Sequence, residues 1–233
     1  MSPAVEQPAV RLRPVATWDL PGEAKVVCTG WGQGDMSGDT ETVLKRRHQV
    51  VDLPWTVLDQ VHGSRVVIVE EPGAMAGEPA DAAVTCLPSV ALGVLSADCA
   101  PVAMSSAEGV IGIAHAGWRG LRAGVVESTV QSMRRLGATR IYAVLGPCIH
   151  PCCYTFSRSD LAEVEARLGC ALESRDSRGE PSLDLPAGVG AALRAAGAFL
   201  VGASRECTAH SAGLWSWRAQ STQRRQATVI WRV

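Results

Sequence analysis

Four short apolar segments follow one another near the middle of the chain, and turn residues separate each from the next. They are residues 82–85, 90–96, 101–104 and 110–115. Apolar runs of this length, bounded by Gly, Pro, Asp and Ser, are typical of buried strands. The run therefore predicts a central sheet, around which the rest of the chain has to be arranged.

Helical spacing appears outside this run. Residues 121–136 carry apolar side chains that repeat every three to four positions, and Gly137 is placed to end that helix. Three shorter helices are predicted behind residues able to cap them, at 39–51 (Asp39), 159–168 (Ser159) and 184–197 (Asp184).

The remaining segments complete one mixed pattern. Further strands are predicted at 25–29, 55–58, 66–69, 141–145, 199–202 and 228–231, and loops at 30–38, 72–79 and 174–180. Residues 1–20 show little periodicity and are predicted to form a loose arm. Because no repeat or low-complexity linker interrupts the chain, we interpret residues 1–233 as a single domain of mixed α and β structure.

Composition and charge exclude several classes of protein. Apolar residues make up 47% of the chain and charged residues 19%, which is typical of a globular protein. The net charge of −1 argues against nucleic-acid binding. No apolar run reaches the roughly 18 residues of a membrane span, and the N-terminus lacks a signal pattern. We therefore expect a cytoplasmic monomer or homodimer with reduced cysteines and no nucleic-acid or membrane partner.

His62, Cys99 and His115 each lie at a turn or at a predicted strand end. Two imidazoles and a thiolate suit Zn²⁺, and three protein ligands leave a fourth position for water. The same residues fit a Cys–His hydrolase with Cys99 as nucleophile. They also fit two hydrogen-bonded histidines beside a buried thiol, and the residues alone leave the three interpretations open.

Two charged residues accompany this trio. Arg119 lies at the entrance to the predicted helix 121–136, where a guanidinium and free backbone N–H groups favour an anion such as phosphate. Asp98 directly precedes Cys99. It is a candidate to orient a metal-bound histidine, to accept a proton, or to cap the turn.

A cysteine-rich run follows the predicted strand at 141–145. Cys148, Cys152 and Cys153 have a Cys-x-x-x-Cys-Cys spacing, which is not a standard zinc spacing. We therefore interpret Cys152 and Cys153 as small buried thiols and keep Cys148, at the strand end, as a candidate site residue. Trp118 and Trp217 stand beside arginines and are candidates to flank a flat ligand, but we favour the interpretation that each is a packing residue.

Five motifs occur together in this chain: Gln60-Val61-His62-Gly63, Ala80-Asp81-Ala82 with Thr85, Ala97-Asp98-Cys99-Ala100-Pro101, His115-Ala116-Gly117-Trp118-Arg119-Gly120 and Gly146-Pro147-Cys148-Ile149. Their order and spacing resemble the YfiH family, also called the laccase-domain or polyphenol-oxidase family. The resemblance runs from about Gly30 to the C-terminus.

This resemblance implies a fold, a metal site and an activity. The family fold is a single α+β domain with mixed sheets in a four-layer α/β/β/α arrangement. The family's metal ligands fall on His62, Cys99 and His115, with Zn²⁺ as the expected ion and copper as an ion bound in vitro. Members are purine nucleoside phosphorylases that split adenosine, inosine or 5′-methylthioadenosine with phosphate, and they also deaminate adenosine.

From the residues and the resemblance together we expect a zinc-dependent purine nucleoside phosphorylase with adenosine deaminase activity. The expected catalytic residues are Asp98, Cys99 and Arg119, and the expected contacts to substrate or phosphate are Gln60, Arg119, Cys148 and Arg218. Residues 31–35 replace the family's usual Asn-Leu-Gly stretch, and residues 215–219 replace its aromatic-Ser-Tyr-Arg-Arg stretch. Both segments are expected to shape the substrate pocket.

Three other functions compete with this expectation. The first is a Cys–His hydrolase or amidase that edits peptidoglycan precursors, since some family members are linked to that process. The second is the copper phenol oxidase of the older family names, although five histidines are too few for a multicopper cluster. The third is a binding protein that uses the metal for structure.

Overall fold

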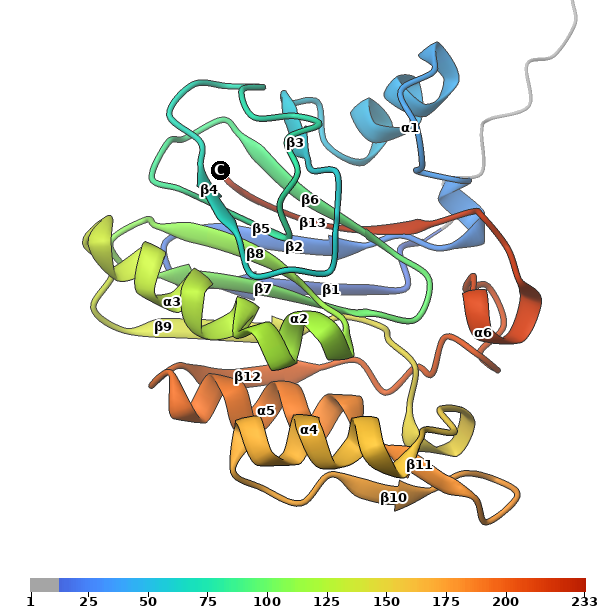
Figure 1. Ribbon diagram of the computed structural model, residues 1–233. Helices are drawn as coiled ribbons and strands as arrows, with labels where there is room; N and C mark the ends of the chain where they lie inside the picture. The colour runs from blue at the N-terminus through green and yellow to red at the C-terminus, as the bar shows by residue number, and fades with distance from the viewer. Residues whose placement is uncertain (1–12) are drawn as a thin grey trace, which may run out of the picture.

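The computed structural model describes residues 13–233, which are built around two stacked β-sheets (Figure 1). One sheet has the strand order β1 (Ala16–Leu20), β2 (Ala24–Cys28), β13 (Gln226–Arg232), β6 (Ala91–Ser96), β3 (Trp55–Val57). The other has the order β12 (Phe199–Ala203), β9 (Ile141–Leu145), β7 (Ala100–Ser106), β8 (Ile111–Ala116), β5 (Ala82–Thr85), β4 (Val66–Ile68). Both sheets are mixed, because β3, β4 and β12 each run parallel to their neighbour while the other pairs are antiparallel.

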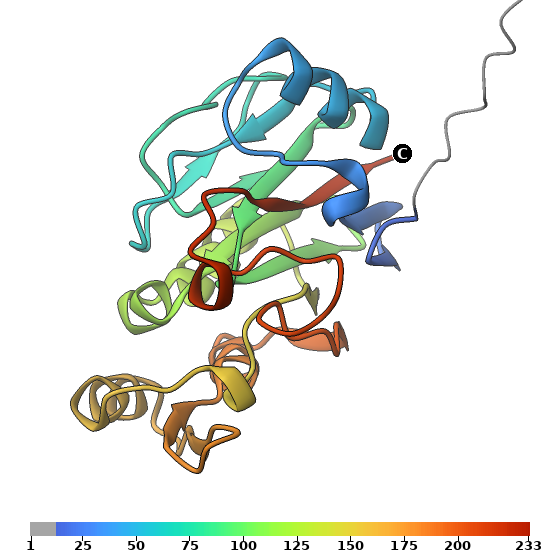
Figure 2. The same cartoon turned by 90° about the vertical axis from the view of Figure 1, so that its right-hand side faces the viewer.

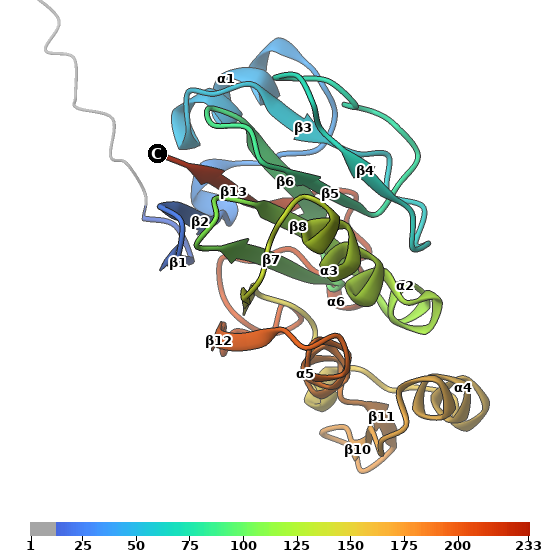
Figure 3. The same ribbon diagram turned by 90° about the vertical axis from the view of Figure 1, so that its left-hand side faces the viewer.

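Apolar side chains fill two cores, one on each face of the six-stranded sheet. Leu92, Ile113 and Ile230 belong to the core between the two sheets. The second core lies between the six-stranded sheet and the helices α2 (Trp118–Ala123), α3 (Val125–Arg135), α4 (Arg158–Leu168) and α5 (Leu185–Ala195). Helix α1 (Glu41–Val50) lies beside β3, at the opposite end of the molecule from α4 and α5 (Figure 3). The expected four-layer α/β/β/α arrangement is therefore confirmed.

The strand predictions are confirmed for every segment named above, with ends displaced by no more than two residues. The central run 82–115 forms β5, β6, β7 and β8. Three of these belong to the six-stranded sheet and β6 to the other, so the run supplies both sheets rather than one.

The prediction of one continuous helix over residues 121–136 is wrong. The chain forms two helices, α2 and α3, which meet at Gly124. Gly124 has φ +86°, a left-handed conformation that glycine adopts without the steric cost of a side chain, and it ends α2 as α3 begins. The apolar spacing still identified the buried face correctly, because Leu121, Val130 and Met133 all lie in the core.

Two predicted helix caps are also wrong. Helix α1 begins behind Thr40, whose side chain accepts a hydrogen bond from the Val43 N–H, whereas Asp39 accepts one from Arg47 Nη1 at 3.0 Å. Helix α4 begins behind Ser157 rather than Ser159. The cap at Asp184 is confirmed, since its Oδ1 accepts a hydrogen bond from the Ala187 N–H at 2.9 Å.

The predictions of irregular structure are only partly right. The loop predicted at 174–180 is the turn of a hairpin formed by β10 (Glu173–Arg175) and β11 (Pro181–Leu183). The loose arm predicted over 1–20 is wrong for its last five residues, which form β1 and pair with β2. Residues 1–12 lie outside the described part of the chain.

One side of the molecule collects the ends of β6 and β8, the start of α2 and the short helix α6 (Trp217–Gln220) (Figure 2). The long segment between β12 and β13 brings α6 to this side. In residues 13–233 no helix combines the length and the apolar character that crossing a bilayer requires.

Candidate metal centre and substrate cavity

His62, Cys99 and His115 come together from three separate segments. His62 lies in the loop before β4, Cys99 in the turn between β6 and β7, and His115 in β8. His62 Nε2 is 3.8 Å from Cys99 Sγ, and the two imidazole rings meet edge to face with 4.9 Å between centroids. One ligand atom from each residue lies within 4.8 Å of the other two, so the structure brings the predicted trio together.

Asp81, which has no exposed surface, organises both histidines. Its Oδ1 accepts hydrogen bonds from His115 Nδ1 and from the His62 N–H, both at 2.9 Å, and its Oδ2 accepts one from the Gly63 N–H at 2.6 Å. The bond to Nδ1 leaves His115 Nε2 as the nitrogen available to a metal. His62 has φ +61°, and the carboxylate bonds of its loop stabilise this strained conformation.

The electrostatics of the trio favour a thiolate. Burial raises the pKa of Cys99, but the neighbouring His115 and His62 outweigh it and lower that pKa to about 6. Burial lowers the pKa of His115, but the Cys99 thiolate and the Asp81 carboxylate outweigh it and raise that pKa to about 9. A site that stabilises a thiolate beside imidazoles is chemically suited to a divalent metal ion.

The donor set and its surroundings fit such an ion. Two imidazoles and one thiolate form a three-ligand set with an open position, and the Asp81–His115 contact is the carboxylate–histidine pair common around metal sites. Gly117 packs against the cluster, where an added Cβ would lie 2.8 Å from Cys99 Sγ. Glycine at this position therefore leaves the trio the space it needs.

Asp98 connects two walls of the site instead of orienting a histidine. Its Oδ1 accepts a hydrogen bond from Thr208 Oγ1 at 2.7 Å, and its Oδ2 accepts one from the Arg218 N–H at 2.7 Å. Asp98 has φ +116°, a conformation that non-glycine residues rarely adopt. The orienting role considered for Asp98 belongs to Asp81.

The trio lies in the wall of a cavity of about 690 Å³. Aromatic and basic side chains line the same cavity, namely Trp118, Tyr154, Trp217, Arg119, Arg218 and Arg225. The Arg119 guanidinium stacks over Trp118 at 4.5 Å, and that of Arg218 lies over Tyr154 at 5.2 Å. Trp217 is half exposed, so its interpretation as a packing residue is wrong.

The other predicted contact residues have different positions. Gln60 lines the cavity, and its amide exchanges hydrogen bonds with the backbone N–H and C=O of Leu95 at 2.8 and 2.7 Å. Cys148 has no exposed surface and does not line the cavity, so the structure does not bring it to the substrate side. Arg119 lies inside the first turn of α2, because that helix begins three residues earlier than predicted.

The sequence reasoning assigned no role to Asp81. The available signal was a carboxylate in Ala80-Asp81-Ala82, directly before an apolar strand. A charged residue at the start of a buried strand needs several hydrogen-bond partners, which here are the ligand loop and His115.

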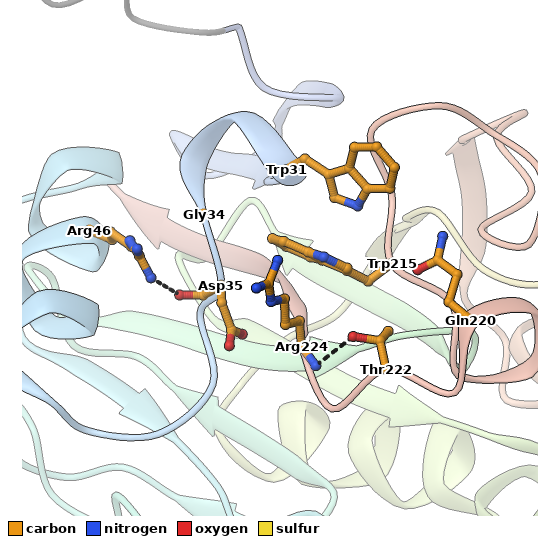
Figure 4. Close-up of a pocket in the computed structure, with 8 residues that line it drawn as sticks. All are labelled: Trp31, Gly34, Asp35, Arg46, Trp215, Gln220, Thr222 and Arg224. Atoms are coloured by element: carbon orange, nitrogen blue, oxygen red, sulfur yellow. Dashed lines mark hydrogen bonds between the residues drawn. The ribbon is translucent and has the colours of Figure 1, made fainter.

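The two segments that depart from the family pattern meet at a second hollow (Figure 4). Trp31 and Trp215 lie one above the other there, and Arg46 donates a hydrogen bond to the Asp35 carbonyl at 2.9 Å. The hollow is lined by Trp31, Gly34, Asp35, Arg46, Trp215, Gln220, Thr222 and Arg224. Residues 31–35 therefore do not line the cavity that contains His62, Cys99 and His115. From the second segment, Trp217 and Arg218 do line it.

Stacked mixed sheets with a His–Cys–His cluster at one side are the arrangement implied by the YfiH resemblance. The sequence model of the family described as multi-copper polyphenol oxidoreductase laccase matches residues 24–233. The chain belongs to this family.

Curated relatives and solved structures agree with this assignment. A Corynebacterium glutamicum protein named purine nucleoside phosphorylase is 33% identical over 94% of each chain. A Streptomyces griseus protein of the same name is 41% identical over 79% of this chain and 77% of its own. The fold matches a Neisseria meningitidis protein with a TM-score of 0.80 at 24% identity, covering 93% of this chain and 98% of that one. It also matches YlmD of Geobacillus stearothermophilus with a TM-score of 0.76 at 25% identity, covering 97% and 99%.

Proposed function

We propose that this chain is a zinc-dependent purine nucleoside phosphorylase that also deaminates adenosine. The observation that carries the proposal is the cluster of His62, Cys99 and His115 in the wall of a cavity lined by aromatic rings and three arginines. Relatives named purine nucleoside phosphorylase support the same activity. The substrates are adenosine, inosine or 5′-methylthioadenosine together with phosphate.

The aromatic residues suit a purine base. Trp118, Tyr154 and Trp217 all line the cavity, and a flat heteroaromatic ring stacks favourably on such side chains. Trp217 is the most exposed of the three, at 50%, so its ring is accessible to a ligand. We therefore assign base recognition to this aromatic wall.

Two of the cavity's three arginines, Arg119 and Arg218, suit phosphate. Phosphorolysis breaks the glycosidic bond at C1′ while phosphate attacks the same carbon, so phosphate has to be held and oriented beside the sugar. Arg119 and Arg218 present guanidinium groups to the cavity, and guanidinium binds phosphate with paired hydrogen bonds. Asp98 fixes the backbone of Arg218 through the 2.7 Å bond to its N–H, which makes Asp98 a positioning residue.

Zinc held by His62, Cys99 and His115 would supply Lewis-acid charge beside the bound substrate. Asp81 keeps the His115 ring in the orientation that this requires, and Gly117 leaves the ligands room. The proposed deaminase activity uses the same cavity.

The test is chromatography of adenosine incubated with the purified protein, with and without phosphate, before and after chelation. Adenine that forms only with phosphate, disappears on chelation and returns with zinc would support phosphorolysis. Inosine formed without phosphate would support deamination. If adenosine, inosine and 5′-methylthioadenosine all remain intact in the zinc-loaded protein, the proposal is wrong.

A second function is favoured by one specific observation, the alignment of Cys99, His115 and Asp81. A Cys–His–Asp hydrolase uses a thiol, an imidazole and a carboxylate. Here the Asp81 carboxylate bonds to His115 Nδ1, on the side of the ring away from the Cys99 thiol. Such an enzyme would cleave an amide or ester, for example in a peptidoglycan precursor. The copper phenol oxidase has no comparable observation, because no candidate metal cluster within residues 13–233 contains more than two histidines.

His62 separates the two mechanisms. The metal site needs His62 as a ligand, whereas the Cys–His–Asp arrangement does not. We expect His62→Ala to lose the zinc of this site together with phosphorolysis. If a His62→Ala protein without metal at this site instead hydrolyses an amide and is inactivated by iodoacetamide at Cys99, the hydrolase is the correct function.

A further inference from the structure

A second cluster of metal-ligating side chains lies outside the cavity just described. Cys152 and Cys153 come from the short 3₁₀ turn Pro151–Cys153, and Cys207 and His210 come from the segment that follows β12. One ligand atom from each of these four residues lies within 4.8 Å of the other three. Two segments more than fifty residues apart in sequence thus bring three thiols and an imidazole to one point.

The spacing of these atoms matches a tetrahedral metal site. Cys152 Sγ lies 3.5 Å from Cys153 Sγ, 3.9 Å from Cys207 Sγ and 3.7 Å from His210 Nδ1, and Cys153 Sγ lies 3.3 Å from that nitrogen. Four ligands at zinc bond lengths of about 2.0–2.3 Å form a tetrahedron with edges of about 3.3–3.8 Å. The observed separations lie close to that range.

The same separations argue against disulfide bonds. A disulfide requires sulfur atoms about 2.05 Å apart. The Cys152 thiol is much farther than that from both Cys153 and Cys207, and all three cysteines are free.

The backbone holds the two contributing segments together. Cys148 and Cys207 form a parallel bridge, and the Thr208 N–H donates to the Cys148 carbonyl at 3.0 Å. The His150 N–H points at Cys207 Sγ with a distance of 3.4 Å, the kind of contact that orients a metal ligand. The Ser177 N–H donates to the Cys152 carbonyl at 3.0 Å and so ties the β10–β11 hairpin to the cluster.

We propose that Cys152, Cys153, Cys207 and His210 form a second, structural zinc site. Thiolates with one imidazole in a tetrahedral set select zinc over harder ions, and four protein ligands leave no open position for a substrate. The adjacent cysteines concealed the site in the sequence, because only the pair Cys207 and His210 has an ordinary ligand spacing.

This site would hold two walls of the substrate cavity in place. Tyr154 directly follows Cys153, and Thr208 directly follows Cys207 and donates to Asp98 at 2.7 Å. A zinc ion between the two segments would therefore join the wall that carries Tyr154 to the segment that leads into α6.

The first test counts zinc in the full-length chain, expressed with zinc and purified under reducing conditions. Replacing two ligands in the double variant Cys152→Ser/Cys153→Ser is expected to remove one zinc per chain. The matched control, Cys86→Ser/Cys170→Ser, also removes two thiols but is expected to keep all the zinc. Equal zinc in the wild type and in Cys152→Ser/Cys153→Ser would overturn the proposal, as would a disulfide among these cysteines in the reduced protein. The double variant leaves His62, Cys99 and His115 unchanged, so its loss of zinc is counted separately from the zinc held by those three residues.

The second test leaves all four ligands intact, so it does not depend on how well the double variant folds. Cys99→Ala removes the only thiolate of the first site, and cobalt then replaces zinc. We expect the Cys99→Ala protein to retain the intense sulfur-to-cobalt charge-transfer band and the visible bands of a tetrahedral ion. A cobalt-treated Cys99→Ala protein without that band would exclude the second site.

Discussion

Asp81 and His115 are joined by two hydrogen bonds where β5 begins beside β8. The His115 N–H donates to the Asp81 carbonyl at 2.7 Å, and His115 Nδ1 donates to the Asp81 carboxylate at 2.9 Å. The sheet pairing therefore fixes both the backbone and the ring of His115, one of the proposed metal ligands. Because the same carboxylate accepts N–H groups from the His62 loop, one buried side chain sets the positions of two ligands.

This relationship predicts the effect of Asp81→Asn. The amide keeps the shape of the carboxylate but removes its charge and part of its accepting capacity. We expect zinc affinity at the His62 site to fall about 10- to 100-fold, which is typical for loss of a partner behind a metal ligand. Competition with a chelator of known affinity measures the change. The matched control is Asp52→Asn, because Asp52 makes a similar 2.8 Å bond to His48 at the surface. Equal zinc affinity in wild type and Asp81→Asn would contradict the positioning role.

Gly117→Ala tests the tight packing around the ligands. Gly117 has φ −70°, so alanine adds no backbone strain there, but its Cβ would lie 2.8 Å from Cys99 Sγ and 3.3 Å from His62 Cδ2. We expect weaker metal binding with little loss of fold stability, measured by metal titration and thermal unfolding. Gly190→Ala is the control. Its Cβ meets only the flexible end of Arg194, and this helical site is expected to gain up to about 1 kcal/mol.

The Asp176 carboxylate predicts an acid-dependent loss of stability. A hydrogen bond from Thr155 Oγ1, opposed by burial and reinforced by the N–H groups of Arg178 and Glu180, lowers the pKa of Asp176. Because the pKa of Asp176 is lower in the folded chain than in the unfolded chain, its ionised carboxylate stabilises the fold at pH values above about 4. That stabilisation is lost as the pH falls through the lowered value. Asp176→Asn should therefore reduce the urea midpoint at pH 7, and the deficit should shrink toward pH 3.

The control for this experiment is Asp19→Asn, which removes an exposed carboxylate 3.4 Å from Lys25. Surface pairs of this kind contribute little, so we expect its midpoint to follow that of the wild type at each pH. A deficit in Asp176→Asn that stays constant from pH 7 to pH 3 would show that the Asp176 charge is unimportant.

The strands were predictable because their signal is local. Apolar runs ended by turn residues marked the positions of β5 to β9 to within two residues. The helix break at Gly124 was not predictable in the same way, because the apolar spacing continues across it. Tertiary packing explains this, since α2 and α3 both bury their apolar side chains in the same core.

The cluster of His62, Cys99 and His115 was predicted from the chemistry of its residue types, but the partners of these residues were not. Asp81 acts through contacts 19 and 34 residues away along the chain, and no spacing pattern shows such contacts. Cys152 and Cys153 were interpreted as buried thiols because their Cys-x-x-x-Cys-Cys run is not a standard zinc spacing, but in the structure both are only partly buried. Cys207 and His210 join them from more than fifty residues later in the chain, so only the fold brings the four together.

The two arginines stacked on Trp118 provide the sharpest test of phosphate binding. The Arg119 guanidinium lies 4.5 Å from the Trp118 ring and lines the cavity, whereas that of Arg122 lies 5.4 Å from the ring and pairs with Glu163 outside it. Arg119→Ala removes the charged donor proposed to bind phosphate, and hydrogen bonds of this kind contribute about 1.5–3 kcal/mol. We therefore expect the KM for phosphate to rise about 10- to 100-fold, with a smaller effect on the KM for the nucleoside. Arg122→Ala should leave both values near those of the wild type. Equal phosphate KM values in the two variants would move phosphate recognition away from Arg119 and toward Arg218.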